Sequence, residues 1–234
     1  LEIFTLHGSL SSFSHSFGHD PTAVSRSMVA VYTEKVNFFF QLSPGFLAHL
    51  EDICYIGKNG KEHIAMDVLV VVDMQNDFID GALGTKEAQA IVPAVVKKAE
   101  AYAAAGDEVV FTLDTHFDGY LDTAEGRKLP VPHCIKGTPG WELCGQLKAF
   151  EGRRFEKHTF GSDSLSDYVR GGDYRSVELV GLCTDICVIS NALILKAAVP
   201  ETPIAVDPAC CAGVSPESHD NAIAAMKVCQ IDIL

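Results

Sequence analysis

The stretch Val177-Glu-Leu-Val-Gly-Leu-Cys-Thr-Asp-Ile-Cys-Val188 decides the fold class that this chain is expected to adopt. Its apolar first part, Val177 to Leu182, is typical of a buried strand. Thr184 or Asp185 can then cap a helix that continues from Ile186 to Ala198. Because a strand that leads directly into a helix is the building unit of α/β folds, the same alternation is expected elsewhere in the chain.

The chain from residue 66 onward does alternate strand and helix patterns. The expected strands are Val68–Asp73, Glu108–Asp114, Arg154–Lys157, Val177–Leu182, Pro203–Val206 and Gln230–Leu234. The expected helices are Glu87–Ala105, Trp141–Phe150, Leu165–Arg170, Ile186–Ala198 and Pro216–Lys227. This order predicts a three-layer α/β/α sandwich around a mostly parallel, Rossmann-like sheet of about six strands.

Residues 1–65 differ in character from the rest. They hold five of the nine histidines, and their Ser-rich and Phe-rich patches follow no steady period. We therefore expect the natural protein to begin near Met66, with residues 1–65 a poorly ordered extension or upstream read-through. A small accessory subdomain is the alternative. Residues 66–234 would form the functional domain.

The composition argues against several classes of partner. The formal net charge of −13 disfavours nucleic acid or an anionic membrane as the main partner. No apolar run reaches the roughly 18 residues that a membrane span needs. The eight cysteines form no CxxC pair and no spacing typical of a small disulfide-bonded domain. Without an evident secretion signal, we expect a cytoplasmic protein with reduced thiols.

Chemically capable side chains follow the ends of the expected strands, where open α/β sheets bind their ligands. They are Asp73, Asp114, His116, Lys157, Cys183, Asp185, Cys187 and Asp207. Each one alone can be a cap or a polar loop residue. Their shared position predicts one site at one edge of the sheet.

Cys187, Lys157 and Asp73 together suit acyl transfer. A helix N-terminus and a nearby lysine both favour a thiolate, which makes Cys187 a candidate nucleophile. A carboxylate such as Asp73 can take the thiol proton and later return it to a leaving group. The alternatives are a core cysteine, a surface salt bridge of Lys157 and a loop cap at Asp73.

Three motifs resemble those of the isochorismatase-like cysteine hydrolases. They are Asp73-Met-Gln-Asn-Asp-Phe78, Glu156-Lys157 and Gly181-Leu-Cys-Thr-Asp-Ile-Cys-Val188, in the order that the family has. The resemblance covers roughly residues 67 to 234. It implies a catalytic triad of Asp73, Lys157 and Cys187.

The resemblance also implies how the nucleophile's surroundings are built. A non-proline cis peptide would fall at Leu182–Cys183. The backbone N–H groups of Cys183 and Cys187 would then form an oxyanion hole. Phe78 would supply an apolar wall against which a substrate ring stacks.

A metal site follows from the same resemblance. Asp114-Thr-His116 and Pro132-His133-Cys134 resemble the DxH…PH pattern of nicotinamidases. Glu125 would be the fourth ligand, with Asp122 as its alternative. Two imidazoles and carboxylates suit one divalent ion, with zinc expected first and iron or manganese as alternatives. The ion would bind the ring nitrogen of a pyridine and turn its amide towards Cys187.

Together these features imply a metal-dependent cysteine amidohydrolase, most like a nicotinamidase, which converts nicotinamide to nicotinate and ammonia through a thioester. Nicotinamidases often carry a tryptophan three residues before the second histidine, where this chain has Pro130. Another small-amide or ureide hydrolase of the same superfamily is therefore the alternative, and a catalytically silent oligomeric binding module is a third reading. The expected partner is a small-molecule amide. Members of the superfamily are often homo-oligomers, so the resemblance also implies a homo-oligomer.

Overall fold

The computed structural model describes residues 2–4, 28–33, 36–41, 55–56, 62–63 and 66–234. The chain divides into two compact units, Leu1–Ile64 and Ala65–Leu234. In the first unit, β1 (Glu2–Phe4), β2 (Met28–Thr33) and β3 (Val36–Gln41) form an antiparallel sheet, and β4 (Tyr55–Ile56) pairs with β5 (Glu62–His63). The expected extension or read-through, residues 1–65, lies for its larger part outside the described residues.

The second unit is built on a six-stranded sheet with the order β11-β10-β9-β6-β7-β8, in which every pairing is parallel. The strands are β6 (Met66–Val72), β7 (Glu108–Asp114), β8 (Arg154–Lys157), β9 (Tyr174–Leu182), β10 (Ile204–Ala212) and β11 (Asp232–Ile233). Parallel sheets are buried on both faces, which explains the near-continuous apolar runs in the central strands.

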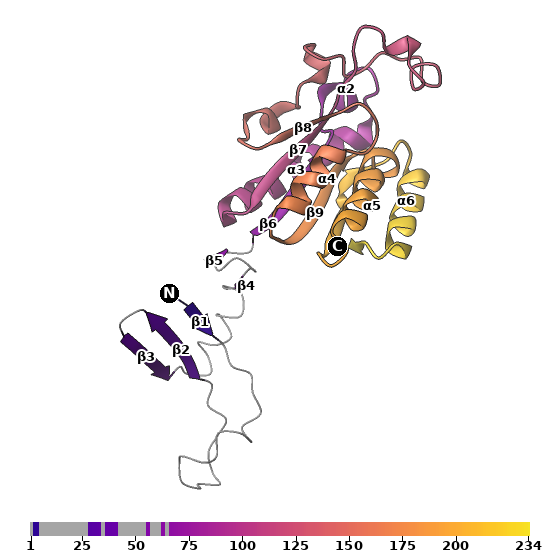
Figure 1. Ribbon diagram of the computed structural model, residues 1–234. Coiled ribbons are helices and arrows are strands. Elements are labelled where there is room, and N and C mark those ends of the chain that lie inside the picture. The colour runs from indigo at the N-terminus through magenta and orange to yellow at the C-terminus, as the bar shows by residue number, and fades with distance from the viewer. Residues whose placement is uncertain (1, 5–27, 34–35, 42–54, 57–61, 64–65) are drawn as a thin grey trace. The chain divides into compact units, whose positions relative to one another are not determined.

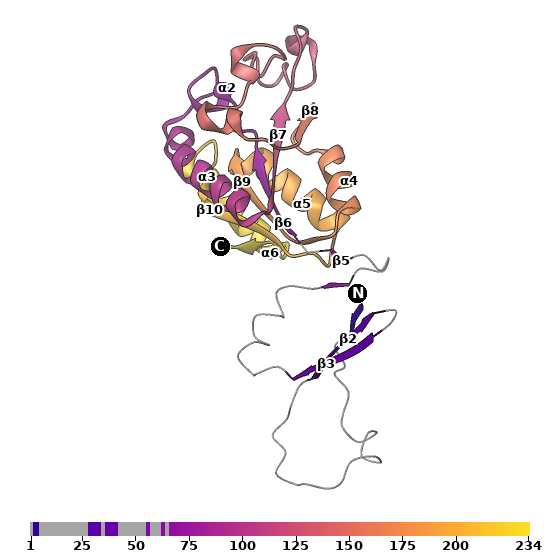
Figure 2. The ribbon, with the colours of Figure 1, turned by 90° about the vertical axis from the view of Figure 1, so that its left-hand side faces the viewer.

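Helices cover both faces of this sheet, as Figure 1 and Figure 2 show. They are α2 (Asn76–Ile79), α3 (Lys86–Ala105), α4 (Asp163–Gly171), α5 (Ile189–Ala198) and α6 (Pro216–Val228). Successive side chains of a strand point to opposite faces. Leu69 and Val71 of β6 therefore pack with α3, and Val68, Val70 and Val72 pack with α4, α5 and α6. The expected α/β/α sandwich is confirmed, with a sheet that is parallel throughout.

The long helix α3 shows how local signals set its ends. The side chain of Thr85 accepts a hydrogen bond from the N–H of Ala88 at 3.0 Å, which caps the first turn. Gly106 ends the helix in the left-handed conformation, with φ of 83°. The expected helix Glu87–Ala105 thus begins one residue earlier than predicted and ends as predicted.

The prediction of a helix at Trp141–Phe150 is wrong. Two short 3-10 turns, η3 (Pro139–Trp141) and η4 (Gly145–Ala149), take its place. The backbone of Leu143 pairs with Gln75 in an isolated antiparallel bridge, which draws the chain out of a helical path. Gly145 then adopts a φ of 44°, which a right-handed helix does not allow.

The helix that carries Cys187 also begins differently from the prediction. A single π-helical turn, η5 (Thr184–Val188), precedes α5, so Cys187 lies in that turn and not in the first turn of the α-helix. Neither predicted cap acts as one: Thr184 Oγ1 lies 2.8 Å from His219 Nδ1, and the Asp185 carboxylate accepts from the N–H of Val214. Turns of this kind are frequent at functional sites.

Strand β10 is longer than the expected Pro203–Val206. It continues to Ala212, with an irregularity in its pairing between Val206 and Cys211. Pro208, which cannot donate a hydrogen bond to a neighbouring strand, lies in this irregular stretch. Asp207 consequently lies inside the strand, 2.6 Å from Lys98 Nζ, and not at the edge with the other candidate residues.

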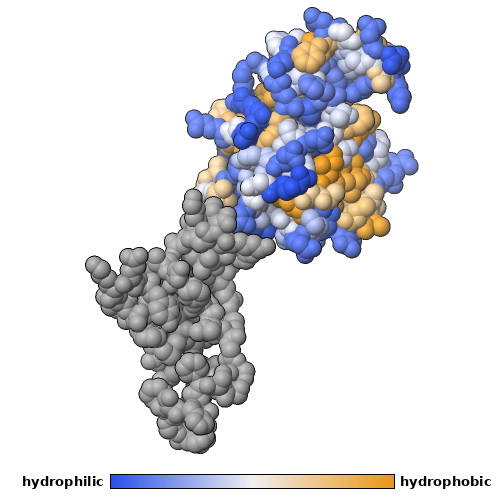
Figure 3. Space-filling model, in the orientation of Figure 1, coloured by the Kyte–Doolittle hydropathy of each residue, from blue (hydrophilic) through white to orange (hydrophobic). Residues whose placement is uncertain are grey.

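The surface of the second unit carries both hydrophilic and hydrophobic residues (Figure 3). On the face shown in Figure 3, hydrophobic residues gather in the region of α5, whose sequence ISNALILKAA is largely apolar. Among the helices of the described part of the chain, none combines the length and the hydropathy needed to cross a membrane.

Candidate active site

Three side chains from separate segments meet at the carboxyl edge of the sheet. Asp73 follows β6, Lys157 is the last residue of β8, and Cys187 lies in η5 after β9. Lys157 Nζ is 2.6 Å from Asp73 Oδ2 and 3.4 Å from Cys187 Sγ. All three residues are buried. The structure thus brings together the three side chains that the sequence predicted to share one site.

The position of Asp73 depends on Thr112, which sequence reasoning missed. Thr112 Oγ1 donates a hydrogen bond to Asp73 Oδ1 at 2.6 Å and accepts one from the Asp73 N–H at 3.2 Å. Asp73 has a φ of 47°, which is unusual for a residue other than glycine. The signal that could have pointed to Thr112 is a single hydroxyl in the middle of an apolar strand.

The protonation of this triad is set by burial. Burial raises the pKa of the Cys187 thiol well above its usual range, and the Asp73 carboxylate raises it further, although Lys157 opposes both. Burial also raises the pKa of Asp73, against the pull of Lys157. Lys157 lowers the thiol pKa, as predicted for a lysine that favours a thiolate, but desolvation has the larger effect and the pKa of Cys187 is raised.

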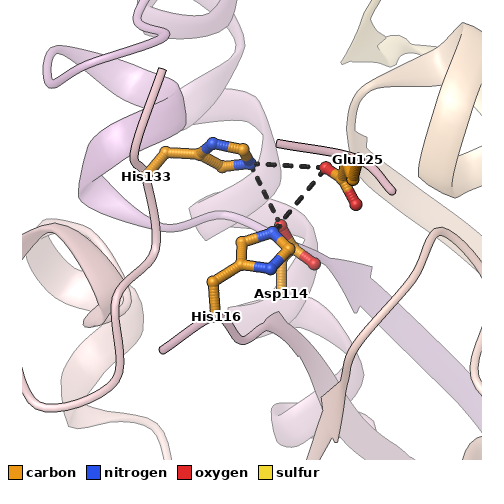
Figure 4. Close-up of side chains that lie close together, drawn as sticks. All are labelled: Asp114, His116, Glu125 and His133. Atoms are coloured by element: carbon orange, nitrogen blue, oxygen red, sulfur yellow. Dashed lines mark ion pairs between the residues drawn. The ribbon is translucent and has the colours of Figure 1, made fainter. Parts of the chain in front are cut away.

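A second cluster lies beside the triad, and Figure 4 shows its side chains turned towards one point. It consists of Asp114, His116, Glu125 and His133, whose ligand atoms all lie within 4.8 Å of one another. Asp114 Oδ2 is 3.0 Å from His116 Nε2 and 3.4 Å from His133 Nε2. Glu125 Oε1 is 3.7 Å from His116 Nε2. Asp122, the alternative to Glu125, is exposed in the short turn η2 (Tyr120–Asp122) and is not part of the cluster.

The orientation of both histidines fits a bound cation. His133 Nδ1 lies 2.8 Å from the carbonyl oxygen of Val131, which can only accept, so Nδ1 carries the proton and Nε2 is left free to coordinate. His116 Nε2 is buried and, among the described residues, makes no hydrogen bond despite its closeness to Asp114. A cation between these atoms would satisfy that nitrogen.

The charge state of Asp114 also fits a bound cation. Burial alone would raise the pKa of Asp114, but His116, His133 and Lys157 hold it well below its usual range. Asp114 is therefore a carboxylate, the form that binds a metal ion. Lys157 Nζ also donates to Asp114 Oδ1 at 3.4 Å, which connects the cluster to the triad.

Two residues of the Asp73–Phe78 motif hold the cluster in place, a role that sequence reasoning did not give them. The Gln75 amide donates to the Asp114 carbonyl oxygen at 2.9 Å and accepts from the Asp114 N–H at 2.8 Å. Asp77 Oδ2 accepts from the N–H of Cys134, the neighbour of His133, at 2.7 Å. The signal was present in the sequence as polar residues directly after a buried strand.

The turn before the nucleophile contains the expected cis peptide, at Leu182–Cys183. The Cys183 carbonyl oxygen accepts hydrogen bonds from the N–H groups of Ile186 and Val188 at 3.1 and 3.0 Å, which ties the start of η5 together. Gly181 precedes this turn with a φ of 116°, and a Cβ there would lie 2.1 Å from the carbonyl oxygen of Val72. Only glycine therefore allows β9 to approach β6 so closely at this point.

Cys187 and three residues of the second cluster open into one cavity of about 520 Å³. Its lining includes Cys187, Cys183, Asp114, Glu125, His133 and Phe78. The Phe78 ring lies 5.5 Å from the His133 ring, measured between centroids. An aromatic ring in this cavity would find Phe78 beside it, with the candidate metal ligands and the thiol within the same space.

Comparison with known proteins agrees with this geometry. A family model described as the isochorismatase domain matches residues 67–233. The nicotinamidase/pyrazinamidase of Mycobacterium tuberculosis is 27% identical over 187 residues, which cover 72% of this chain and 98% of that protein.

Two solved structures are similar in fold and sequence. The pyrazinamidase of Pyrococcus horikoshii in complex with zinc superposes with a TM-score of 0.63 at 26% identity, over 72% of this chain and 98% of that chain. The N-carbamoylsarcosine amidase of Thermoplasma acidophilum superposes with a TM-score of 0.59 at 28% identity, over 72% of this chain and 95% of that chain.

Proposed function

The chain belongs to the isochorismatase family, and on that premise we propose that it is a metal-dependent cysteine amidohydrolase that converts nicotinamide to nicotinate and ammonia. The observation that carries the proposal is the shared cavity, which Cys187 lines together with Asp114, Glu125 and His133, three of the four residues of the cluster. The similarity to a nicotinamidase/pyrazinamidase supports this choice of substrate.

The first step is activation of the thiol. Asp73 takes the proton of Cys187, and Lys157, which contacts both groups, balances the charge that passes between them. The thiolate sulfur then attacks the amide carbon, and the carbonyl oxygen becomes an oxyanion. The backbone N–H groups of Cys183 and Cys187 are the proposed donors to that oxyanion.

The second step releases the products. Asp73 returns its proton to the amide nitrogen, the C–N bond breaks and ammonia leaves, with a thioester on Cys187. Water, deprotonated by Asp73, attacks the thioester carbon and the C–S bond breaks. Asp73 passes that proton to the Cys187 sulfur, and the acid product loses its proton to solvent as the carboxylate. The same carboxyl group thus serves as base and acid in turn.

Asp114, His116, Glu125 and His133 would hold one divalent ion, and the ion would supply a Lewis acid for the nitrogen of a pyridine ring. Zinc is proposed first, since a similar pyrazinamidase binds it, and iron and manganese are the alternatives. Phe78 would support the ring from the side.

The test is ammonia release from nicotinamide by the zinc-loaded full chain. We expect Cys187→Ala to lower kcat by at least about 10³-fold, because the nucleophile is lost. Cys229→Ala, at an exposed cysteine after α6, is the matched control and should keep full activity. Full activity in the Cys187→Ala protein would reject the mechanism.

A hydrolase of another small amide or a ureide is the second candidate. It is favoured by Pro130, which stands where nicotinamidases often have a tryptophan, and by the similarity to an N-carbamoylsarcosine amidase. Ammonia release from N-carbamoylsarcosine, compared with nicotinamide at equal concentration, separates the two. A silent binding module would release ammonia from neither.

A further inference from the structure

The cavity that holds Cys187 is larger than a single-ring amide needs. Its volume is about 520 Å³. One water molecule takes about 30 Å³ in the liquid, so the roughly nine non-hydrogen atoms of nicotinamide would fill at most about 270 Å³. About half of the cavity is then left for a further part of the ligand.

The wall of this extra space is apolar. Phe160, Val214 and Leu129 line the cavity while remaining 45%, 61% and 37% exposed in the ligand-free protein. Ile186 and Leu83 extend the same lining. Large apolar side chains grouped around a cavity, and not scattered singly over a surface, are typical of a binding site.

Hydrogen bonds connect the backbone of two of these residues to the segment that carries Cys187. The buried amide of Asn191 donates to the carbonyl oxygens of both Cys187 and Phe160, at 2.8 and 3.1 Å. The Asp185 carboxylate accepts from the N–H of Val214 at 3.1 Å. The backbone of Phe160 and of Val214 is therefore held at a set distance from the thiol, as a specificity wall requires.

The charges of the lining favour a neutral ligand group. Among the described residues that line the cavity, Lys128 is the single lysine or arginine, and it is exposed. Asp114 and Glu125 are carboxyl groups that a divalent ion would occupy. An anionic substituent beyond the ring would therefore find no buried cation to pair with, and would lose its hydration.

We propose that this cavity takes an extended aromatic amide, in which a neutral apolar group beyond the amide-bearing ring packs against Phe160 and Val214. The inference rests on the proposed amidohydrolase function and deepens it, because the bond that is cleaved stays the same. It names a substrate class that is larger and more apolar than nicotinamide itself.

The kinetic test compares two amides on the zinc-loaded full chain. Quinoline-3-carboxamide keeps the ring nitrogen and the carboxamide of nicotinamide and adds one fused benzene ring. Because the added ring leaves water for an apolar wall, its kcat/KM should be about tenfold higher than that of nicotinamide. A nicotinamide with a carboxylate at ring position 5 should have a lower kcat/KM than nicotinamide.

Substitutions in the apolar wall test whether Phe160 and Val214 cause the preference for the larger amide. Phe160→Ser and Val214→Ser should each lower the ratio of the two kcat/KM values, quinoline amide over nicotinamide, by about fivefold to tenfold. Phe117→Ser is the matched control, because Phe117 is 56% exposed but does not line the cavity. That substitution should leave the ratio unchanged.

Binding to the Cys187→Ala protein separates the two proposals. Calorimetry should show tighter binding of quinoline-3-carboxamide than of nicotinamide. If nicotinamide is hydrolysed but the larger amide is neither preferred nor affected by the wall variants, the extended site is overturned and the proposed function stands. If neither amide releases ammonia while the larger one still binds more tightly, the extended site stands and the proposed function falls.

Discussion

At the scale of single residues, Lys157 joins the two halves of the site. Its ammonium group contacts Asp73 at 2.6 Å, Asp114 at 3.4 Å and Cys187 at 3.4 Å, and its side chain is almost fully buried. Burial opposes a charged lysine, but the neighbouring carboxylates outweigh it and keep the pKa of Lys157 above its usual range. Two buried carboxylates thus depend on one cation.

Replacing that cation should cost both stability and activity. We expect Lys157→Met to lower the free energy of unfolding by about 3–5 kcal/mol, because Asp73 and Asp114 are left buried and uncompensated. Urea unfolding measures the loss, and kcat should fall with it. Lys136→Met is the control: Lys136 pairs with Glu156 at the surface, and its loss should cost less than about 1 kcal/mol. Equal losses in the two variants would contradict this account.

The raised pKa of the Cys187 thiol predicts how the protein reacts with alkylating agents. A raised thiol pKa means that the reactive thiolate forms only at a pH above the ordinary cysteine range of about 8.5. The rate of Cys187 alkylation by iodoacetamide should therefore stay low at pH 7 and rise through alkaline pH. Peptide mass spectrometry against pH checks this, with the exposed Cys229 as internal reference. A Cys187 rate that is already maximal at pH 7 would show a stabilised thiolate instead.

At the scale of elements, the short helix α2, which comes shortly after β6 and Asp73, contacts the loop that carries His133. Asp77 lies in the first turn of α2 and accepts from the Cys134 N–H at 2.7 Å. Cys134 itself has a φ of 45°, so this loop needs an outside contact to keep its path. The helix therefore supports the loop of His133, a candidate metal ligand, although Asp77 is not one of the four candidate ligands.

Removal of this contact should weaken metal binding. We expect Asp77→Ala to raise the Kd for zinc about 10–100-fold, because His133 loses the support of its loop. Competition with a chromophoric chelator measures the Kd. Asp118→Ala, at an exposed acidic residue between His116 and Tyr120, is the control and should leave zinc affinity within about twofold. Unchanged affinity in Asp77→Ala would remove Asp77 from this role.

At the scale of the whole molecule, we propose that residues 66–234 fold and act without residues 1–65. Every strand of the six-stranded sheet and every residue of the candidate site lies in the second unit. Limited proteolysis should therefore produce a resistant fragment that begins near Met66, identified by mass spectrometry, with the kcat of the full chain. A resistant fragment that contains residues 1–65 would contradict the proposal.

The homo-oligomer that the family resemblance implies also concerns the whole molecule, and it stays a prediction. The apolar sequence of α5, with Leu193 38% exposed, would supply a surface for self-association. Analytical ultracentrifugation of the full chain measures the mass in solution. A monomer at micromolar concentration would contradict the predicted homo-oligomer.

The sequence by itself determined the α/β architecture and which residues could share a site. Strands β7 and β8 have the predicted bounds, because apolar runs and their polar ends are local signals. The meeting of Asp73, Lys157 and Cys187 could be anticipated from topology, since neighbouring parallel strands end at one edge of a sheet. The four candidate ligands were implied by the family resemblance, which left Asp122 as the alternative to Glu125.

Only the tertiary structure decided how those residues behave. The π-helical turn at Cys187 and the ion pair of Asp207 with Lys98 depend on partners remote in the chain. The raised pKa of the Cys187 thiol comes mainly from desolvation, which outweighs the effect of the nearby lysine. Periodicity and motif spacing describe neighbours along the chain, whereas burial and contact distances arise only when distant segments pack. Burial and contacts determine the pKa values of the site residues, the hydrogen bonds that position them and the volume of the cavity.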